Sequence, residues 1–258
     1  MKPLVKIILF LLLSTFARSQ QTLYNTKQLK NKLDSLQLVL KNAPNDTLRM
    51  IIYGELGLYY MEIKRDSALY WFEQKLLLAK NLNLKLWEAD SYDFAGYVLN
   101  SLGNYSKSLQ YLLKGIEITE DPETEKGIWK LSEFYARNAR SVRLSELGLL
   151  HHNMGYLYDQ TGNFRQAIIE YFESLKIADE INDEVLLSLN YVTLGGTYLK
   201  MNSLDSAIIY EKKALDYFNQ SSDTKTNGLC LLVFGQAYLL KGNKILAKNT
   251  SMNLSRLV

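Results

Sequence analysis

The sequence is poor in cysteine, histidine and proline, and each shortage excludes something. Its single cysteine excludes any disulfide within the chain, so stability must come from burial of apolar side chains. Its two histidines are the neighbours His151 and His152, which point about 100° apart on a helix and therefore do not face one metal ion together. Three prolines in 258 residues leave room for long uninterrupted helices.

The motifs of common catalytic sites are absent as well. The chain has no glycine-rich phosphate loop, no G-x-S-x-G nucleophile motif, no H-E-x-x-H zinc motif and no cysteine pair. Cys230 lies in an apolar helical run and is predicted to be a core residue. We therefore predict a protein that is not an enzyme and that uses no cofactor and no metal.

Residues 1–19 have the features of a secretory signal peptide. Lysines precede a mostly apolar run from Ile7 to Ala17, which is too short to span a bilayer, and small residues follow at the usual cleavage spacing. The alternative is a short membrane anchor. A lipoprotein is not expected, because the only cysteine lies far from this segment. We expect an exported, periplasmic protein.

The signal segment also accounts for the positive charge of the chain. Residues 1–19 hold three of the 30 basic residues and no acidic one, so the remainder has 27 of each sign. No basic stripe remains that would attract nucleic acid or anionic lipid. The sequence therefore predicts neither a nucleic-acid partner nor a stable membrane span once the leader is removed.

The rest of the chain is dominated by a regular repeat. Each unit has two apolar runs at helical spacing, joined by a short polar turn. Small residues let the two helices approach closely, and such a pair must stack on its neighbours to cover its apolar side. Two earlier units are marked by Gly57 and Gly96. The later units repeat, at one constant step, Gly155, Gly195 and Gly235, Tyr158, Tyr198 and Tyr238, and Ala167, Ala207 and Ala247.

These residues resemble the tetratricopeptide repeat (TPR) pattern. Ala167-x3-Tyr171 and Ser174-Leu175 match it, whereas His151 and its equivalents hold the slot of the family tryptophan. The resemblance implies an all-α, right-handed superhelical solenoid of antiparallel helix pairs, with about five repeats of ~40 residues. His151 is then predicted to pack in that slot.

The predicted organisation has three parts and one insertion. Residues 1–19 are the signal peptide, residues 20–45 form an N-terminal helix, and residues 46–258 form the solenoid. The step from Gly96 to Gly155 is longer than the constant step of the later glycines, so a segment is inserted, at about 120–142. We expect a short inserted helix, which is either a packing elaboration or a recognition feature with Trp129 and Phe134 as anchors.

The first helices of such repeats line a concave groove, so the resemblance also implies binding residues. The groove is predicted to be polar and acidic early and apolar late, which suits an amphipathic helix or an extended peptide. Self-association through the C-terminal repeat, or coverage of the stripe by a further repeat, is the alternative. The predicted groove residues are Tyr97, His152, Tyr156, Asp159, Val192, Leu199, Leu232, Gln236 and Leu239.

A narrower resemblance concerns the start of the chain. A leader, a helix with Asp34-Ser35-Leu36, and Asn45-Asp46-Thr47 before the repeats are similar to the exported TPR sensor regions of Bacteroidetes-type sensor histidine kinases. The leading hypothesis is a non-enzymatic exported TPR scaffold that binds a protein or peptide in the bacterial envelope. The alternative is a truncated or detached periplasmic sensor region of a two-component signalling histidine kinase.

Overall fold

The structure is a computed structural model that describes residues 28–131, 138–218 and 224–254. Every regular element in these ranges is a helix, which confirms the predicted all-α class. The predicted signal peptide lies outside the described residues. Within them, no helix is both long enough and apolar enough to cross a bilayer. Contacts between Cα atoms divide the chain into two compact units, Met1–Lys75 and Leu76–Val258.

The first unit contains a helix over residues 28–41, then α2 (Asp46–Met61) and most of α3 (Arg65–Asn81). The side chain of Asn45 caps α2 by accepting a hydrogen bond from the backbone N–H of Leu48 at 2.9 Å. Inside this unit, Gly57 lies against the ring of Phe72, so α2 and α3 approach closely at that point.

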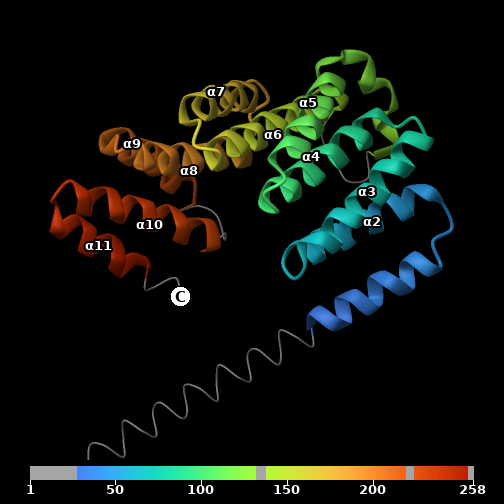
Figure 1. Cartoon of the computed structure of the whole chain (residues 1–258), viewed down its shortest axis with the longest axis horizontal. Coiled ribbons are helices and arrows are strands. Elements are labelled where there is room, and N and C mark those ends of the chain that lie inside the picture. Colours follow the sequence, from blue (N-terminus) through green and yellow to red (C-terminus); the bar gives the residue numbers. More distant parts are fainter. Residues whose placement is uncertain (1–27, 132–137, 219–223, 255–258) are drawn as a thin grey trace, which may run out of the picture. The chain divides into compact units, whose positions relative to one another are not determined.

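The second unit is built from four antiparallel helix pairs that follow one another along the chain (Figure 1). Consecutive pairs contact each other, as expected for a solenoid, and the predicted stacking of helix pairs is confirmed. The pairs are α4 (Lys85–Ser101) with α5 (Tyr105–Glu120), α6 (Ala139–Gln160) with α7 (Phe164–Glu180), α8 (Glu184–Lys200) with α9 (Leu204–Phe218), and α10 (Thr224–Leu240) with α11 (Lys244–Leu254).

The turns inside the four pairs share one backbone conformation. The backbone φ is 77° at Gly103, 80° at Gly162, 59° at Asn202 and 77° at Gly242. A residue in this left-handed region ends a helix and lets the chain reverse, and glycine and asparagine tolerate it best. The polar turns predicted from the sequence therefore have a definite backbone requirement.

Close approach of the two helices within a pair depends on the repeated glycines. A Cβ atom at Gly155 would lie 2.6 Å from the ring of Tyr171 and 3.1 Å from the backbone oxygen of Ala167, so no side chain fits between α6 and α7 there. The other repeated glycines also face the second helix of their own pair, tightly at Gly96 and Gly195 and with ordinary contact distances at Gly235. Gly96 faces Leu112, Gly195 faces Glu211, and Gly235 faces Thr250.

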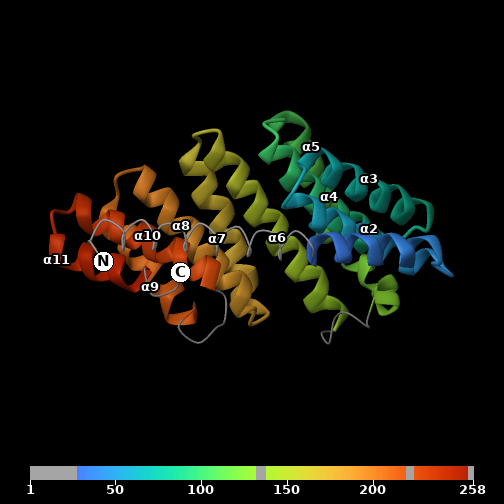
Figure 2. The same ribbon diagram turned by 90° about the horizontal axis from the view of Figure 1, so that it is seen from below.

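The helices of the second unit form two layers. The first helices of the pairs contact one another directly, α4 with α6, α6 with α8, and α8 with α10. The second helices α5, α7, α9 and α11 lie on the other side (Figure 1), and Figure 2 shows the same stack turned by 90°. In a curved stack the helices are closest on the concave side. We call the surface of α4, α6, α8 and α10 the inner face.

The predicted insertion contains a 3-10 helix, η1 (Pro122–Leu131), and the beginning of the 22-residue helix α6. Asn138 caps α6 by accepting a hydrogen bond from the N–H of Ser141 at 2.8 Å. Phe134 lies outside the described residues, and so does the side chain of Trp129. Their proposed role as anchors stays a prediction.

Candidate functional site

Polar side chains link α6 to α8 on the inner face. Ser145 donates a hydrogen bond to Asp183 at 3.0 Å, and Thr197 donates one to Asp159 at 2.9 Å. Both pairs join residues that are close to one repeat length apart, because equivalent turns of α6 and α8 lie side by side. These bonds fix the register of the inner face.

Two tyrosines stack on the inner face between the first two pairs. The rings of Tyr97 on α4 and Tyr156 on α6 have centroids 5.8 Å apart and planes inclined by 23°. The equivalent position on α8 is Gly196, where an added Cβ would meet no atom within 4 Å. The row of tyrosines therefore ends at an open place on α8.

His152 does not present its imidazole at an open groove. Its side chain is buried, 6% exposed, with Nδ1 3.0 Å from Oδ1 of Asn190 and its ring beside that of Tyr171. Burial lowers the pKa of His152 to about 4, although the hydrogen bond to Asn190 opposes the shift. The imidazole is therefore neutral at pH 7 and joins α6 to α8. Its neighbour His151 is half-buried, with Nδ1 2.9 Å from Oε2 of Glu170.

Asp159 and Val192 are also buried within the stack. Asp159 accepts hydrogen bonds from Thr197 and from the ammonium group of Lys200, so its charge is compensated inside the protein. Val192 packs in a core cluster with Ala214 and Cys230. For these residues and His152, the closeness of the next first helix leaves little surface for a partner, and any binding role stays a prediction.

The remaining predicted groove residues keep exposed surface. Tyr97, Tyr156 and Leu199 are half-buried, and Gln236 is exposed. Leu232 and Leu239 on α10 are 46% and 59% exposed, far more than core leucines such as Leu194. The open part of the inner face is thus aromatic on α4 and α6 and apolar on α8 and α10.

The part of the inner face on α4, which was predicted to be acidic, has little negative charge at Asp93. Asp93 is buried and accepts a hydrogen bond from the side-chain amide of Asn153 at 2.8 Å. Burial raises the pKa of Asp93 to about 7; Asn153 opposes this shift, whereas the charge of Asp90 adds to it. The pairing of Asp93 with Asn153 was not predicted from the sequence, because the insertion separates these residues by more than one repeat length.

Among the residues described by the structure, no group of three His, Cys, Asp or Glu side chains is arranged to hold a metal ion. The arrangement that does emerge is a helical repeat with one open inner face, which defines a class of interaction scaffold.

The comparisons with known proteins agree with that class. Residues 19–140 match the family described as the SusR N-terminal TPR domain, and residues 150–180 match the tetratricopeptide repeat. Together with the fold, these matches identify the chain as a TPR protein. No curated protein matches it in sequence.

Solved structures are similar to the chain in fold, among them one whose repeats are described as TPR-like. They include BtubC from P. vanneervenii, with 14% identity, coverage of 90% of this chain and 88% of that chain, and a TM-score of 0.64. PilW, a type IV pilus biogenesis factor, has 16% identity, coverage of 93% and 90%, and a TM-score of 0.59. A putative kinesin light chain from Podosopora anserina has 12% identity, coverage of 83% and 96%, and a TM-score of 0.54. At these identities the likeness concerns the fold.

Proposed function

We propose that this protein is a non-enzymatic, exported scaffold of the bacterial envelope that binds a protein or peptide on the apolar part of its inner face. TPR folds serve as protein-interaction scaffolds, and the surface in question is the one left open by the stacking of first helices. The observation that carries the proposal is the exposure of Leu232 and Leu239, 46% and 59%, two turns apart on α10. Exposed apolar residues grouped on one face commonly mark an interaction site.

The open place at Gly196 extends this apolar surface onto α8. Leu199 lies one turn further along α8 and is half-buried, so the two positions face the same side of the helix. A partner with large apolar side chains at helical spacing, or in alternate positions of an extended segment, would cover this surface. Binding by such a groove would combine apolar burial with few directional bonds.

The test compares two variants of the full chain. Replacing both Leu232 and Leu239 by glutamate places charges where the partner would bury apolar surface, and we expect loss of specific proteins from affinity capture out of a native envelope extract. Ile209→Glu is the matched control, because Ile209 is 55% exposed on the outer helix α9. Both variants should keep the helical circular dichroism of the wild type. Identical sets of captured proteins for the wild type and the inner-face variant would contradict the proposal.

Export is tested separately from binding. Residues 1–19 fused to an alkaline phosphatase that is active only in the periplasm should give phosphatase activity, because they have the charge and length of a cleavable leader. A fusion without activity would contradict export and leave the binding proposal to its own test. The sensor-kinase alternative stays a prediction.

Self-association is a second candidate, favoured by the last helix pair. Leu240 and Ile245 are 62% and 76% exposed, and both lie at the turn between α10 and α11. If two copies meet there, light scattering after gel filtration should give twice the mass of the mature chain, and Ile245→Glu should restore a monomer. A monomeric wild type would exclude this candidate.

A further inference from the structure

The insertion after α5 is fixed to the fold by one buried arginine. Arg143 on α6 is 7% exposed; its Nε donates to Oε1 of Glu125 at 2.8 Å, and its Nη1 donates to the backbone oxygen of Thr119 at 2.6 Å. One guanidinium group thus holds both the end of α5 and the helix η1. Charge-assisted bonds of this kind are stronger than neutral ones, so η1 has a defined place in the fold.

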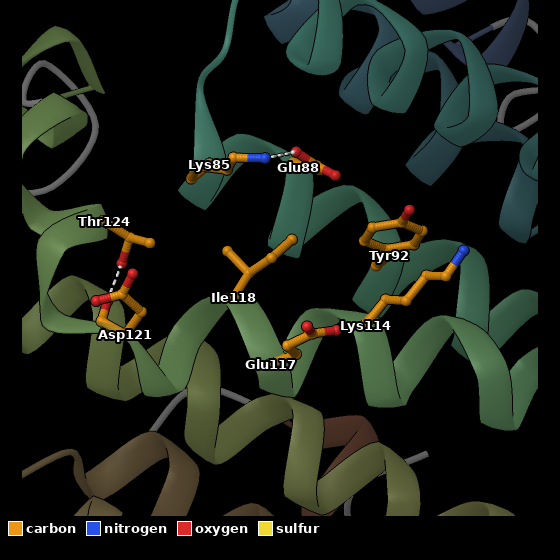
Figure 3. Close-up of a pocket in the computed structure, with 8 residues that line it drawn as sticks. All are labelled: Lys85, Glu88, Tyr92, Lys114, Glu117, Ile118, Asp121 and Thr124. Atoms are coloured by element: carbon orange, nitrogen blue, oxygen red, sulfur yellow. Dashed lines mark hydrogen bonds and ion pairs between the residues drawn. The ribbon is translucent and has the colours of Figure 1, made fainter.

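A pocket of about 410 Å³ lies between α4, α5 and η1, a volume common for small-molecule sites (Figure 3). On α4, Lys85, Glu88 and Tyr92 are three and four residues apart. On α5, Lys114 is three residues before Glu117 and four before Ile118, so each helix turns one face to the pocket. Thr124 of η1 closes it, which means that the insertion supplies one of its walls. The lining residues are Lys85, Glu88, Tyr92, Lys114, Glu117, Ile118, Asp121 and Thr124.

The charges of this pocket are separated along α5. Asp121 lies at one end beside Thr124, and Lys114 lies at the other end with its ammonium group turned towards Tyr92 (Figure 3). Ile118 lies between them. The end of α5 also carries the negative end of the helix dipole, which reinforces the carboxylate of Asp121.

Two lysines lie beside Tyr92 at the other end of the pocket. The ammonium groups of Lys80 and Lys114 lie 4.9 Å and 5.8 Å from the centre of the Tyr92 ring. Of the two, only Lys114 lines the pocket, and Glu117 follows it three residues later in the lining. The remaining pair, Lys85 and Glu88, is joined at 3.0 Å and is neutral as a whole.

The charged groups at the two ends are open to a ligand. Within the described residues no salt bridge joins Lys114, Glu117 or Asp121 to a partner. One oxygen of the Asp121 carboxylate accepts the backbone N–H of Glu123 at 2.9 Å, which leaves its charge without a cation. A ligand that carries a cation at this end and an anion at the other would therefore compensate both.

We propose that this pocket binds a small dipolar molecule, with an ammonium group at Asp121, a carboxylate at Lys114 and a short apolar chain over Ile118. Such a molecule brings each of its own two charges to a side chain of opposite sign, the ammonium to Asp121 and the carboxylate to Lys114. A ligand with a single charge leaves the other end of the pocket unpaired. The two ends are two helical turns apart on α5, about 10 Å along the helix axis, so a chain of about five methylene groups suits the span.

The experiment titrates the full chain by calorimetry with 6-aminohexanoate, and with hexylamine and hexanoate as probes that each lack one charge. We expect 6-aminohexanoate to bind with a dissociation constant below about 1 mM, and the singly charged probes to bind at least about tenfold more weakly. Asp121→Asn and Lys114→Gln should each weaken 6-aminohexanoate by about tenfold or more. Lys126→Gln is the control, because this exposed lysine of η1 does not line the pocket.

Three results would overturn the proposal. They are no heat of binding with 6-aminohexanoate, equal binding of hexylamine, which would indicate a simple cation site, or binding that survives both Asp121→Asn and Lys114→Gln. Both substitutions change exposed side chains, so the variants should fold, and unchanged thermal unfolding without ligand will establish this. None of these outcomes depends on the partner-binding test of the inner face.

Discussion

The carboxyl group of Glu211 lies directly against Gly195, with its Cδ 2.7 Å from the place that a Cβ on that glycine would take. Glu211 is fully buried, and within the described part of the chain neither of its carboxyl oxygens has a hydrogen-bond partner. Tyr171 takes the equivalent position in the preceding pair, against Gly155. An acid thus replaces an aromatic ring at a helix crossing.

This placement predicts that the protein loses stability as the pH rises. Burial raises the pKa of Glu211 from its ordinary 4.5 to about 8, and the neighbouring Cys230 opposes this shift. The protonated form therefore favours folding: its contribution is complete below pH 4.5 and is lost as the pH rises through 8, by roughly 3–5 kcal/mol. Urea unfolding at pH 5, 7 and 9 should show this loss in the wild type and a smaller loss in Glu211→Gln. Equal pH dependence in both proteins would contradict the assignment.

The repeat register explains why the fold was predictable. The structure places Gly155, Gly195 and Gly235 each against the second helix of its pair. At Gly155 and Gly195 a Cβ would collide with that helix, whereas Gly235 keeps the register without such a collision. The same register could have revealed Glu211, since it lies one repeat length after Tyr171, in a slot that holds Leu112 in the first pair of the second unit. The repeat period therefore identifies the residues that depart from the pattern, such as Glu211, as well as those that follow it.

The candidate site was harder to predict, for a physical reason. The register places His152, Asp159 and Val192 on the side of the first helices that faces inward, but it does not say how closely the next first helix approaches. Their burial depends on that approach, which brings His152 to Asn190 and Asp159 to Thr197. The pocket beside η1 could not be predicted from the repeat register, because the insertion that forms one of its walls interrupts the repeat.

Because His152 is buried, we predict that the protein loses stability at acidic pH. Burial lowers its pKa from 6.5 to about 4, so the folded state resists protonation that the unfolded chain accepts. Stability is complete above pH 6.5 and falls as the pH drops towards 4, by about 2–3 kcal/mol. His152→Gln keeps an amide that can bond Asn190 and should reduce this loss in urea unfolding between pH 7 and 4. His151→Gln is the control, and an equal effect of the two substitutions would argue against burial of His152 as the cause.

We predict that replacing the buried Asn100 by an apolar residue stabilises the protein. Its side chain is 4% exposed on α4, and in the described part of the chain both its amide nitrogen and its oxygen lack hydrogen-bond partners. A buried polar group without partners costs free energy, so Asn100→Leu should raise the free energy of unfolding by about 1–2 kcal/mol. The nearby Asn104→Leu should instead lower it by about 1 kcal/mol, because Asn104 caps α5. Thermal unfolding of both variants measures the contrast; destabilisation by Asn100→Leu would show that the amide has a partner in solution, such as water.

We predict that Arg143 holds the insertion in place on the fold. Arg143→Met removes the bonds to Glu125 and to the Thr119 carbonyl, leaving a partly buried carboxylate without its cation. We expect a loss of about 2–4 kcal/mol in the free energy of unfolding and faster hydrogen exchange in η1 and the last turn of α5. Arg140→Met is the matched control, because that side chain is 62% exposed and its ion pair with Glu180 contributes little. If exchange in η1 were as slow in Arg143→Met as in the wild type, contacts other than the buried guanidinium would have to hold the insertion, and the pocket wall would not depend on this residue.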